Sequence, residues 1–233
     1  MSRHRMRWPF IISIILFWSA YFACAFPGYS VPIVTTLMVV LLSLPAVLEV
    51  NRENWSLLLI LSLYAYAIET IGLLTGYPYG VFVYGSAIGP KVLGFLPLLL
   101  PFAYVPLVIG VGALTRRRSL LLATICLLAV DIVIDPGAVR LGYWAYAHGD
   151  FYGVPLTNFL GWIFTGSIAL FIVRQFYGRI PIAAARSLMW QLSFWTGVSV
   201  WSGLFFPAVV GIVLHIPVVY ELWSERSMSF STR

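Results

Sequence analysis

The chain has 233 residues, of which 61% are hydrophobic and only 9% are charged. No soluble domain of this length can bury so much apolar surface, so the composition excludes a soluble domain and predicts an all-α, polytopic membrane protein in a lipid bilayer. The net charge of +6 does not indicate a nucleic-acid partner, because the sequence has no clustered basic patch with interleaved polar residues that could read bases.

The apolar runs cover, in chain order, residues 8–27, 31–50, 55–75, 93–114, 119–135, 156–173 and 187–223. A membrane span needs about 20 residues, so each of the first six runs predicts one transmembrane helix. The last run contains Gly203 and Pro207 and has room for two helices joined by a tight turn. We therefore expect eight spans, and seven with a long kinked last helix is the alternative.

One integral membrane domain is expected over residues 1–224, followed by a short cytoplasmic tail over 225–233. The first run follows a basic stretch and precedes Ala23-Cys24-Ala25, which resembles a signal peptide. Because many more spans follow, we expect an uncleaved first helix.

The basic residues predict how the chain is oriented. Ten arginines fall in alternate gaps between the apolar runs, and the intervening gaps hold only Lys91 and Arg140. By the positive-inside rule, this asymmetry predicts a multi-pass protein of the cell membrane with a cytoplasmic N-terminus. The ten are Arg3, Arg5, Arg7, Arg52, Arg116, Arg117, Arg118, Arg174, Arg179 and Arg186.

The sequence carries no signature of a cofactor or a metal. Cys24 and Cys126 are far apart and lack C-x-x-C spacing, so neither a disulfide framework nor a zinc site is expected. Lys91 is the sole lysine and lies in a loop, which excludes a retinal Schiff base within the bundle. Neither a His-rich metal box nor a G-x-G-x-x-G nucleotide motif is present.

Three carboxyl groups lie inside or at the mouths of apolar spans. A helical rise of about 1.5 Å per residue places Glu69 and Asp131 roughly 20 Å from the cytoplasmic ends of their spans, with Asp135 one turn beyond Asp131. A carboxylate at membrane depth is costly and usually marks function. Asp131 and Asp135, at i and i+4, can share a proton. The alternative for Asp135 is an ion pair with Arg140 at the membrane interface.

Both acid-bearing spans run into loops rich in Gly, Pro, Tyr and Trp, over residues 76–92 and 136–155. These loops are expected on the non-cytoplasmic side, folded back over the bundle as a lid; aromatic belts at the membrane interface are the alternative. Because Pro136 disfavours helix at the preceding residue, the fifth span is expected to end at Asp135.

Small and aromatic residues accompany the acids. Gly72 and Gly76 lie on the face of Glu69, where they leave room for a ligand or for close helix packing. Asn158 and Trp162, at i and i+4, begin the next span and are expected to point into the bundle at the height of the acids. Asn158 can position a water or a carboxylate, or make a plain interhelical hydrogen bond.

Two segments resemble the carotenoid biosynthesis membrane protein family, which includes hydratases of acyclic carotenoid ends. The first is E-x-x-G-x-x-T-G-x-P-x-G-x-x-x-Y from Glu69 to Tyr84. The second combines D-x-x-x-D-P, from Asp131, with F-Y-G-V-P-x-T-N-F-x-G-W, which ends at Trp162. The resemblance implies a cofactor-independent hydro-lyase whose substrates are an acyclic carotenoid and water. Other enzymes of carotenoid biosynthesis are candidate partners.

The implied reaction protonates a terminal C=C and captures the tertiary carbocation with water, which needs a neutral carboxylic acid near an apolar chain end. The resemblance makes Glu69, Asp131 and Asp135 the candidate catalytic residues. The candidate substrate-binding residues are Tyr77, Tyr79, Tyr84, Trp144, Tyr152, Asn158 and Trp162. The alternatives are an end-group cyclase or isomerase that adds no water, a proton-coupled membrane carrier, and a non-catalytic carotenoid-binding subunit.

Overall fold

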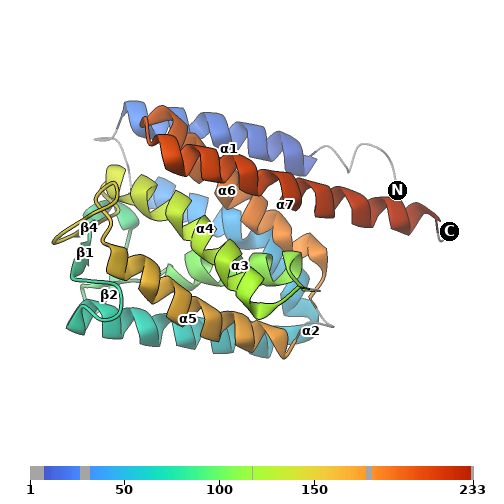
Figure 1. The fold of residues 1–233 in the computed structure, drawn as a ribbon, viewed down its shortest axis with the longest axis horizontal. Helices are drawn as coiled ribbons and strands as arrows, with labels where there is room; N and C mark the ends of the chain where they lie inside the picture. The colour runs from blue at the N-terminus through green and yellow to red at the C-terminus, as the bar shows by residue number, and fades with distance from the viewer. Residues whose placement is uncertain (1–7, 27–31, 117, 177–179, 232–233) are drawn as a thin grey trace.

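The structure is a computed structural model that describes residues 8–26, 32–116, 118–176 and 180–231. Its helices form one bundle, with two small sheets gathered at one end (Figure 1). The helices are α1 (Trp8–Ala25), α2 (Pro32–Thr75), α3 (Leu100–Leu114), α4 (Leu120–Arg140), α5 (Leu156–Arg174), α6 (Ala185–Trp201) and α7 (Phe205–Ser231). The predicted all-α class is therefore confirmed.

Helix α2 consists of two helices joined at Asn54, whose φ of −145° and ψ of 52° are not helical. Counted this way, the eight predicted apolar helices are found among the described residues. Six of them are long and apolar enough to cross a membrane. The other two, α3 with 15 residues and α6 with 17, are shorter than the ~20 residues of a full span. Helix α7 continues beyond residue 224, where the cytoplasmic tail was expected to begin.

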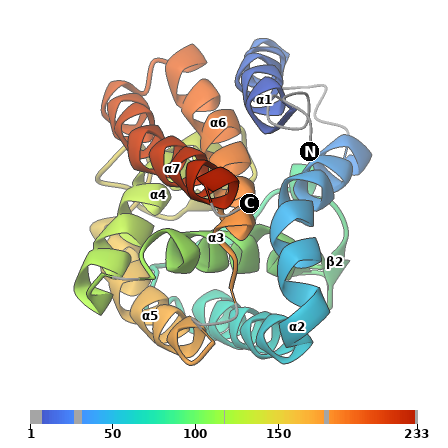
Figure 2. The same cartoon turned by 90° about the vertical axis from the view of Figure 1, so that its right-hand side faces the viewer.

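The two shorter helices form the centre of the bundle. All residues of α3 from Tyr104 to Ala113 are buried, and so are those of α6 from Ala185 to Ser199 apart from Arg186. They approach closely at Gly110, where an added Cβ would lie 2.6 Å from the Cβ of Leu188. Figure 2 shows α3 at the centre of the bundle and α6 running outward from it between α1 and α7.

The two aromatic-rich loops pair with each other. Strand β1 (Phe82–Tyr84) of the first loop pairs antiparallel with β4 (Trp144–Tyr146) of the second, with Phe82 opposite Tyr146. The first loop also forms the turn η3 (Ser86–Ile88) and a hairpin of β2 (Lys91–Val92) and β3 (Leu96–Pro97). A further short turn, η5 (Ile182–Ala184), precedes α6. The hairpin occupies the start of the run predicted as a span from residue 93, so that helix begins only at Leu100.

The prediction that the fifth span ends at Asp135 was wrong, because α4 continues through Pro136 to Arg140. The reason is tertiary packing. An added Cβ on Gly137 would lie 3.1 Å from Trp195 and 3.2 Å from Val198, so this turn of α4 lies directly against α6. Burial of this turn outweighs the local preference of a residue that precedes proline.

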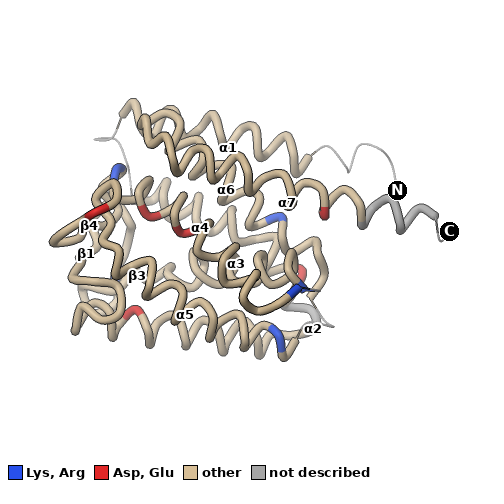
Figure 3. Tube along the Cα trace, in the orientation of Figure 1, with Lys and Arg blue, Asp and Glu red and all other residues tan. Residues whose placement is uncertain are grey.

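The Lys and Arg residues that Figure 3 shows lie mostly at the end of the bundle away from the sheets. At one end, Arg174 donates to the backbone oxygen of Arg118 at 2.6 Å, and Arg186 lies 3.6 Å from Glu49. The paired loops with Lys91 and Arg140 lie at the opposite end. The orientation of the bundle, with the paired loops on the non-cytoplasmic side, stays a prediction.

The orientation can be tested with single cysteines in a chain whose Cys24 and Cys126 are replaced by alanine. Leu93→Cys lies in the β2–β3 turn and Gln175→Cys at the end of α5; both positions are exposed. We expect a membrane-impermeant maleimide to label Leu93→Cys in intact cells and Gln175→Cys only after permeabilisation. The reverse pattern would contradict the orientation.

Candidate active site

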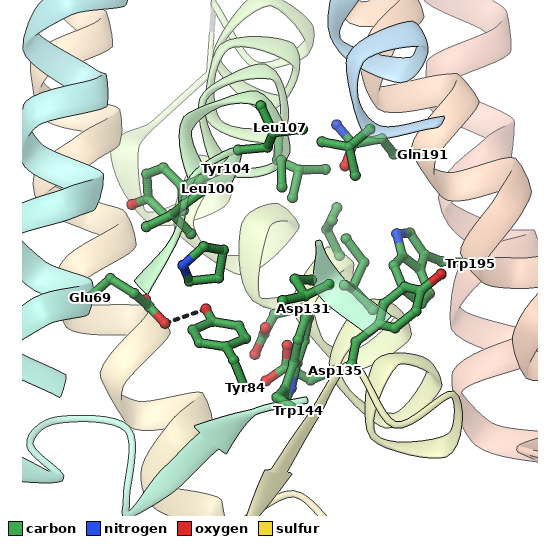
Figure 4. A pocket seen from close by; sticks show the side chains of 18 of the residues that line it. Glu69, Tyr84, Leu100, Tyr104, Leu107, Asp131, Asp135, Trp144, Gln191 and Trp195 are labelled. Atoms are coloured by element: carbon green, nitrogen blue, oxygen red, sulfur yellow. Dashed lines mark hydrogen bonds between the residues drawn. The ribbon is translucent and has the colours of Figure 1, made fainter. Parts of the chain in front are cut away.

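The three predicted carboxyl groups line one pocket. It lies between α2, α3, α4 and α6, beneath the β1–β4 sheet, and Glu69, Asp131 and Asp135 all face it (Figure 4). Aliphatic residues such as Leu42, Leu107 and Val130 form much of the remaining wall. The aromatic residues of the wall are Tyr79, Phe82, Tyr84, Phe102, Tyr104, Tyr143, Trp144, Tyr146, Trp162 and Trp195. The pocket is therefore an apolar, aromatic space with a few acids on its wall.

The amide of Asn158 joins the two aspartates. Its Nδ2 donates to Asp135 Oδ2 at 2.6 Å and to Asp131 Oδ2 at 3.2 Å. Its Oδ1 accepts from the hydroxyl of Tyr146 at 3.0 Å, and that hydroxyl also lies 2.9 Å from Asp135 Oδ2. Asp131, Asp135 and Asn158 are each at most 3% exposed. A buried polar network therefore links α4, α5 and β4.

One oxygen of this network has no partner. Asp131 Oδ1 is buried and accepts no hydrogen bond from a donor among the described residues, while the Asp131 carboxyl group also lies within hydrogen-bonding reach of the Asp135 carboxyl group. Its sister oxygen is held by Asn158, which fixes the carboxyl group in place. A buried oxygen without a partner is costly unless a ligand or a bound proton uses it. Oδ1 is thus the oxygen on which Asp131 can carry a proton.

The third acid has a separate partner. The hydroxyl of Tyr84 donates to Glu69 Oε1 at 2.5 Å, and Lys91 Nζ donates to the backbone oxygen of Tyr84 at 2.6 Å. Burial, followed by the nearby Glu69 carboxylate, raises the pKa of Tyr84 well above its usual range. Burial likewise raises the pKa of Tyr146. Both phenols therefore keep their protons and act as donors at neutral pH.

Tyr79 lines the pocket, and its ring packs between Gly72 and Gly161. An added Cβ would lie 2.8 Å from its ring at Gly72 and 2.7 Å at Gly161. Its hydroxyl lies 3.0 Å from Thr165 Oγ1, and burial raises its pKa. Of the two alternatives for Gly72, close packing is the one that the structure shows, with an aromatic ring rather than a helix as the neighbour.

Most of the predicted site residues meet at this pocket. Besides the three acids, it is lined by Tyr79, Tyr84, Trp144, Asn158 and Trp162. Asp135 binds Asn158 and Tyr146, so the alternative partner Arg140 is not the one observed.

Two predicted residues lie outside the pocket lining. Tyr77, in the turn directly after α2, is 70% exposed. Tyr152 is 41% exposed and has a φ of 49° in a tight turn, where its ring packs edge-on against Phe151. Each belongs to a sharp turn that directs its side chain outward.

The sequence reasoning missed Tyr146 and the residues contributed by α6. The alternation of side chains along a strand could have identified Tyr146, because residues 144 and 146 lie on the same face of a strand and Trp144 was already a candidate. Gln191 is the only amide side chain in α6, and its Nε2 is buried without a partner among the described residues. Trp195 lies one turn further along the same face. No local signal distinguishes that tryptophan from an ordinary core residue.

The described residues contain no group of three or more His, Cys, Asp and Glu side chains placed to hold a metal ion. The carboxyl groups of the pocket instead accept hydrogen bonds from the amide of Asn158 and from the phenols of Tyr84 and Tyr146. What the site offers is proton donors and acceptors on an apolar wall.

The fold and the site together define a polytopic helical membrane protein with an acid-bearing apolar pocket. The chain belongs to the carotenoid biosynthesis protein family, whose sequence model matches residues 28–218, so the resemblance noted from the two motifs is confirmed. It is also similar to the bisanhydrobacterioruberin hydratase of Haloarcula japonica, with 42% identity over 135 residues. That alignment covers 53% of this chain and 45% of the relative, so the chain spans about half the length of the curated protein it matches. No solved structure matches.

The Asn158 network makes a prediction about stability. Asn158→Leu keeps the side-chain size but removes the donor to both aspartates, so we expect the free energy of unfolding to fall by about 1–3 kcal/mol. Ser167→Ala, a partly buried position on the same helix whose hydroxyl binds only the backbone oxygen of Phe164, is the control and should change stability little. Thermal unfolding in detergent measures both variants. An unchanged melting temperature for Asn158→Leu would show that the network does not stabilise the fold.

Proposed function

We propose that the protein is a carotenoid hydratase that adds water across a terminal C=C bond of an acyclic carotenoid. The observation that carries this proposal is the buried carboxyl group of Asp131, whose Oδ1 accepts no hydrogen bond from the described residues, on the wall of a pocket that is otherwise largely apolar and aromatic. An apolar chain end fits such a space, and a carboxylic acid is the group that can protonate an isolated alkene there.

In the proposed first step, Asp131 donates its proton from Oδ1 to the less substituted carbon of the double bond. The positive charge then develops on the carbon that bears two methyl groups. Asn158 holds the other oxygen of Asp131 and also binds Asp135, so the carboxylate that forms keeps one hydrogen bond. A preorganised donor of this kind stabilises charge as it develops.

Aromatic faces stabilise the tertiary cation in the second step. Tyr84, Trp144 and Trp195 line the same pocket as the acids, and Tyr84 packs edge-to-face with Trp144 at 5.9 Å between ring centroids. The negative faces of aromatic rings attract a cation, and the attraction grows when water is excluded. The wall thus lowers the energy of the intermediate without offering it a nucleophile.

Water capture completes the reaction. Glu69 is the second acid of the pocket, on a different helix, and Tyr84 fixes its carboxylate. We assign to Glu69 the task of accepting a proton from the water as its oxygen bonds to the cation. The product is a tertiary alcohol. Before the next turnover, Glu69 releases the proton that it gained and Asp131 takes one up, so both acids return to their starting protonation states.

The relative supports the reaction class, because its name identifies it as a hydratase of a carotenoid. Its substrate, bisanhydrobacterioruberin, is therefore a substrate to try with this chain, beside other acyclic carotenoids. The proposed chemistry needs no metal or redox cofactor, since acid, base and water supply every proton and the oxygen.

Substitution of the acids tests the proposal. In a host that makes an acyclic carotenoid, the wild-type chain should produce a pigment heavier by one water, measured by chromatography with mass spectrometry. Asp131→Asn should lower the rate about 10²–10⁴-fold, the usual contribution of a general acid, and Glu69→Gln should also lower it.

Glu49→Gln is the matched control, because Glu49 pairs with Arg186 at the other end of the bundle. It should keep full activity. A product of unchanged mass would instead indicate a cyclase or isomerase. Unaltered pigment together with proton-dependent uptake into vesicles would indicate a carrier. Pigment bound equally well by wild type and Asp131→Asn, but never altered, would indicate a binding subunit.

Isotopes test the source of the new atoms. In ¹⁸O-labelled water, the oxygen of the product should carry the label, because the hydroxyl group comes from water and not from dioxygen. In D₂O, one deuterium should appear on the carbon next to the alcohol. Treatment of the purified enzyme with a chelator should leave the rate unchanged. Label from dioxygen, or loss of activity restored by a metal ion, would contradict the mechanism.

A further inference from the structure

A second cavity lies beside the acid pocket, between the C-terminal half of α1 and the start of α2. Phe22 and Ala23 of α1 form one wall, Val34 of α2 forms another, and Phe194 of α6 contributes from the core. Aromatic and aliphatic side chains dominate this lining. The mechanism proposed above does not use this space.

The second cavity adjoins the acid pocket. Met38 and Tyr143 line both spaces. At this junction the hydroxyl of Tyr143 lies 3.5 Å from Thr35 Oγ1, a long contact between two elements distant in sequence. Met38 is partly buried, and its unbranched thioether side chain adapts readily to neighbours of different shape. The side chains of Met38 and Tyr143 thus stand between the two spaces.

The other side of the second cavity faces the lipid. Helix α1 packs along α6 and makes few contacts with α2, although the two helices are consecutive in sequence (Figure 2). Phe22 and Val34, on the two sides of this sparse boundary, are 62% and 60% exposed. In a bundle that crosses a bilayer, exposed apolar residues of this kind meet hydrocarbon. The cavity therefore lies between the lipid and the acids.

We propose that this second cavity admits the substrate from the bilayer and holds its polyene chain while the chain end lies against Asp131. The inference rests on the proposed function and names the part of the site that binds the chain. A carotenoid is far longer than the acid pocket, so most of the molecule must lie elsewhere. An apolar cavity that adjoins the pocket and borders the lipid suits a hydrocarbon with no polar group along its length.

Filling the cavity tests the inference. Ala23→Phe narrows one wall, and Val34→Trp narrows the other at a position whose exposure lets the fold tolerate a larger side chain. Ala25→Phe and Ile33→Trp are the matched controls: each introduces the same aromatic side chain close by, at an exposed residue outside the lining. Melting temperatures identify any variant that fails to fold.

The substrates are β-farnesene, squalene and lycopene, which share one type of chain end and differ in length; bisanhydrobacterioruberin replaces lycopene if it is the better substrate. We expect the kcat/KM of the wild type to rise with chain length. Each cavity variant should lower kcat/KM for the longest substrate about tenfold or more, the size of effect that a single crowded apolar contact produces. The loss should fall on KM rather than kcat, because the acids are unchanged.

The inference would be overturned if both cavity variants kept the kcat/KM of the wild type for the longest substrate. It would also be overturned if the loss in the cavity variants fell only on kcat, or if kcat/KM fell equally for every chain length. A loss in the matched controls equal to that in the cavity variants would do the same. Failure of the proposed function is a separate result, because the wild-type chain would then hydrate none of these compounds.

Discussion

Polar groups inside this bundle must find partners within the protein, because neither lipid nor an apolar core can hydrogen-bond them. The Asn158 amide meets this requirement for two carboxyl groups at once and accepts a third hydrogen bond from Tyr146. One side chain of α5 thereby fixes α4 and the β4 strand relative to each other. The position of both aspartates on the pocket wall follows from that single amide.

The pairing of β1 with β4 serves the same requirement for the backbone. Loops near a membrane surface carry amide groups that need partners, and each loop here supplies them to the other. The alternation of a strand then determines the chemistry of the pocket cover. Phe82, Tyr84, Trp144 and Tyr146 all face the pocket, while Val83, between the first two, is 64% exposed. The sheet thus places a hydroxyl beside Glu69 and another beside Asp135.

Much of this arrangement could be predicted from the sequence. Hydropathy located the apolar helices, and the cost of burying a carboxylate identified Glu69, Asp131 and Asp135. Local rules failed where tertiary contacts decided the outcome. Pro136 did not end α4, because Gly137 lets that turn pack on α6. Tyr77 and Tyr152 resembled the pocket aromatics in composition, but turn geometry directs them outward. Nothing local to α2 or α4 shows that their acids share one pocket, since that depends on how the bundle closes around α3 and α6.

The separation of the acids on two helices is what the proposed chemistry requires. Hydration adds a proton to one carbon and oxygen to its neighbour, so the donor and the water-binding base must reach adjacent atoms without neutralising each other. Asp131 is held through Asn158 on the α5 side, and Glu69 through Tyr84 on the sheet side. Each carboxyl group keeps its own hydrogen-bonded partner and cannot swing freely toward the other. A chain end placed between two such fixed groups meets an acid and a base that need no reorganisation as charge develops.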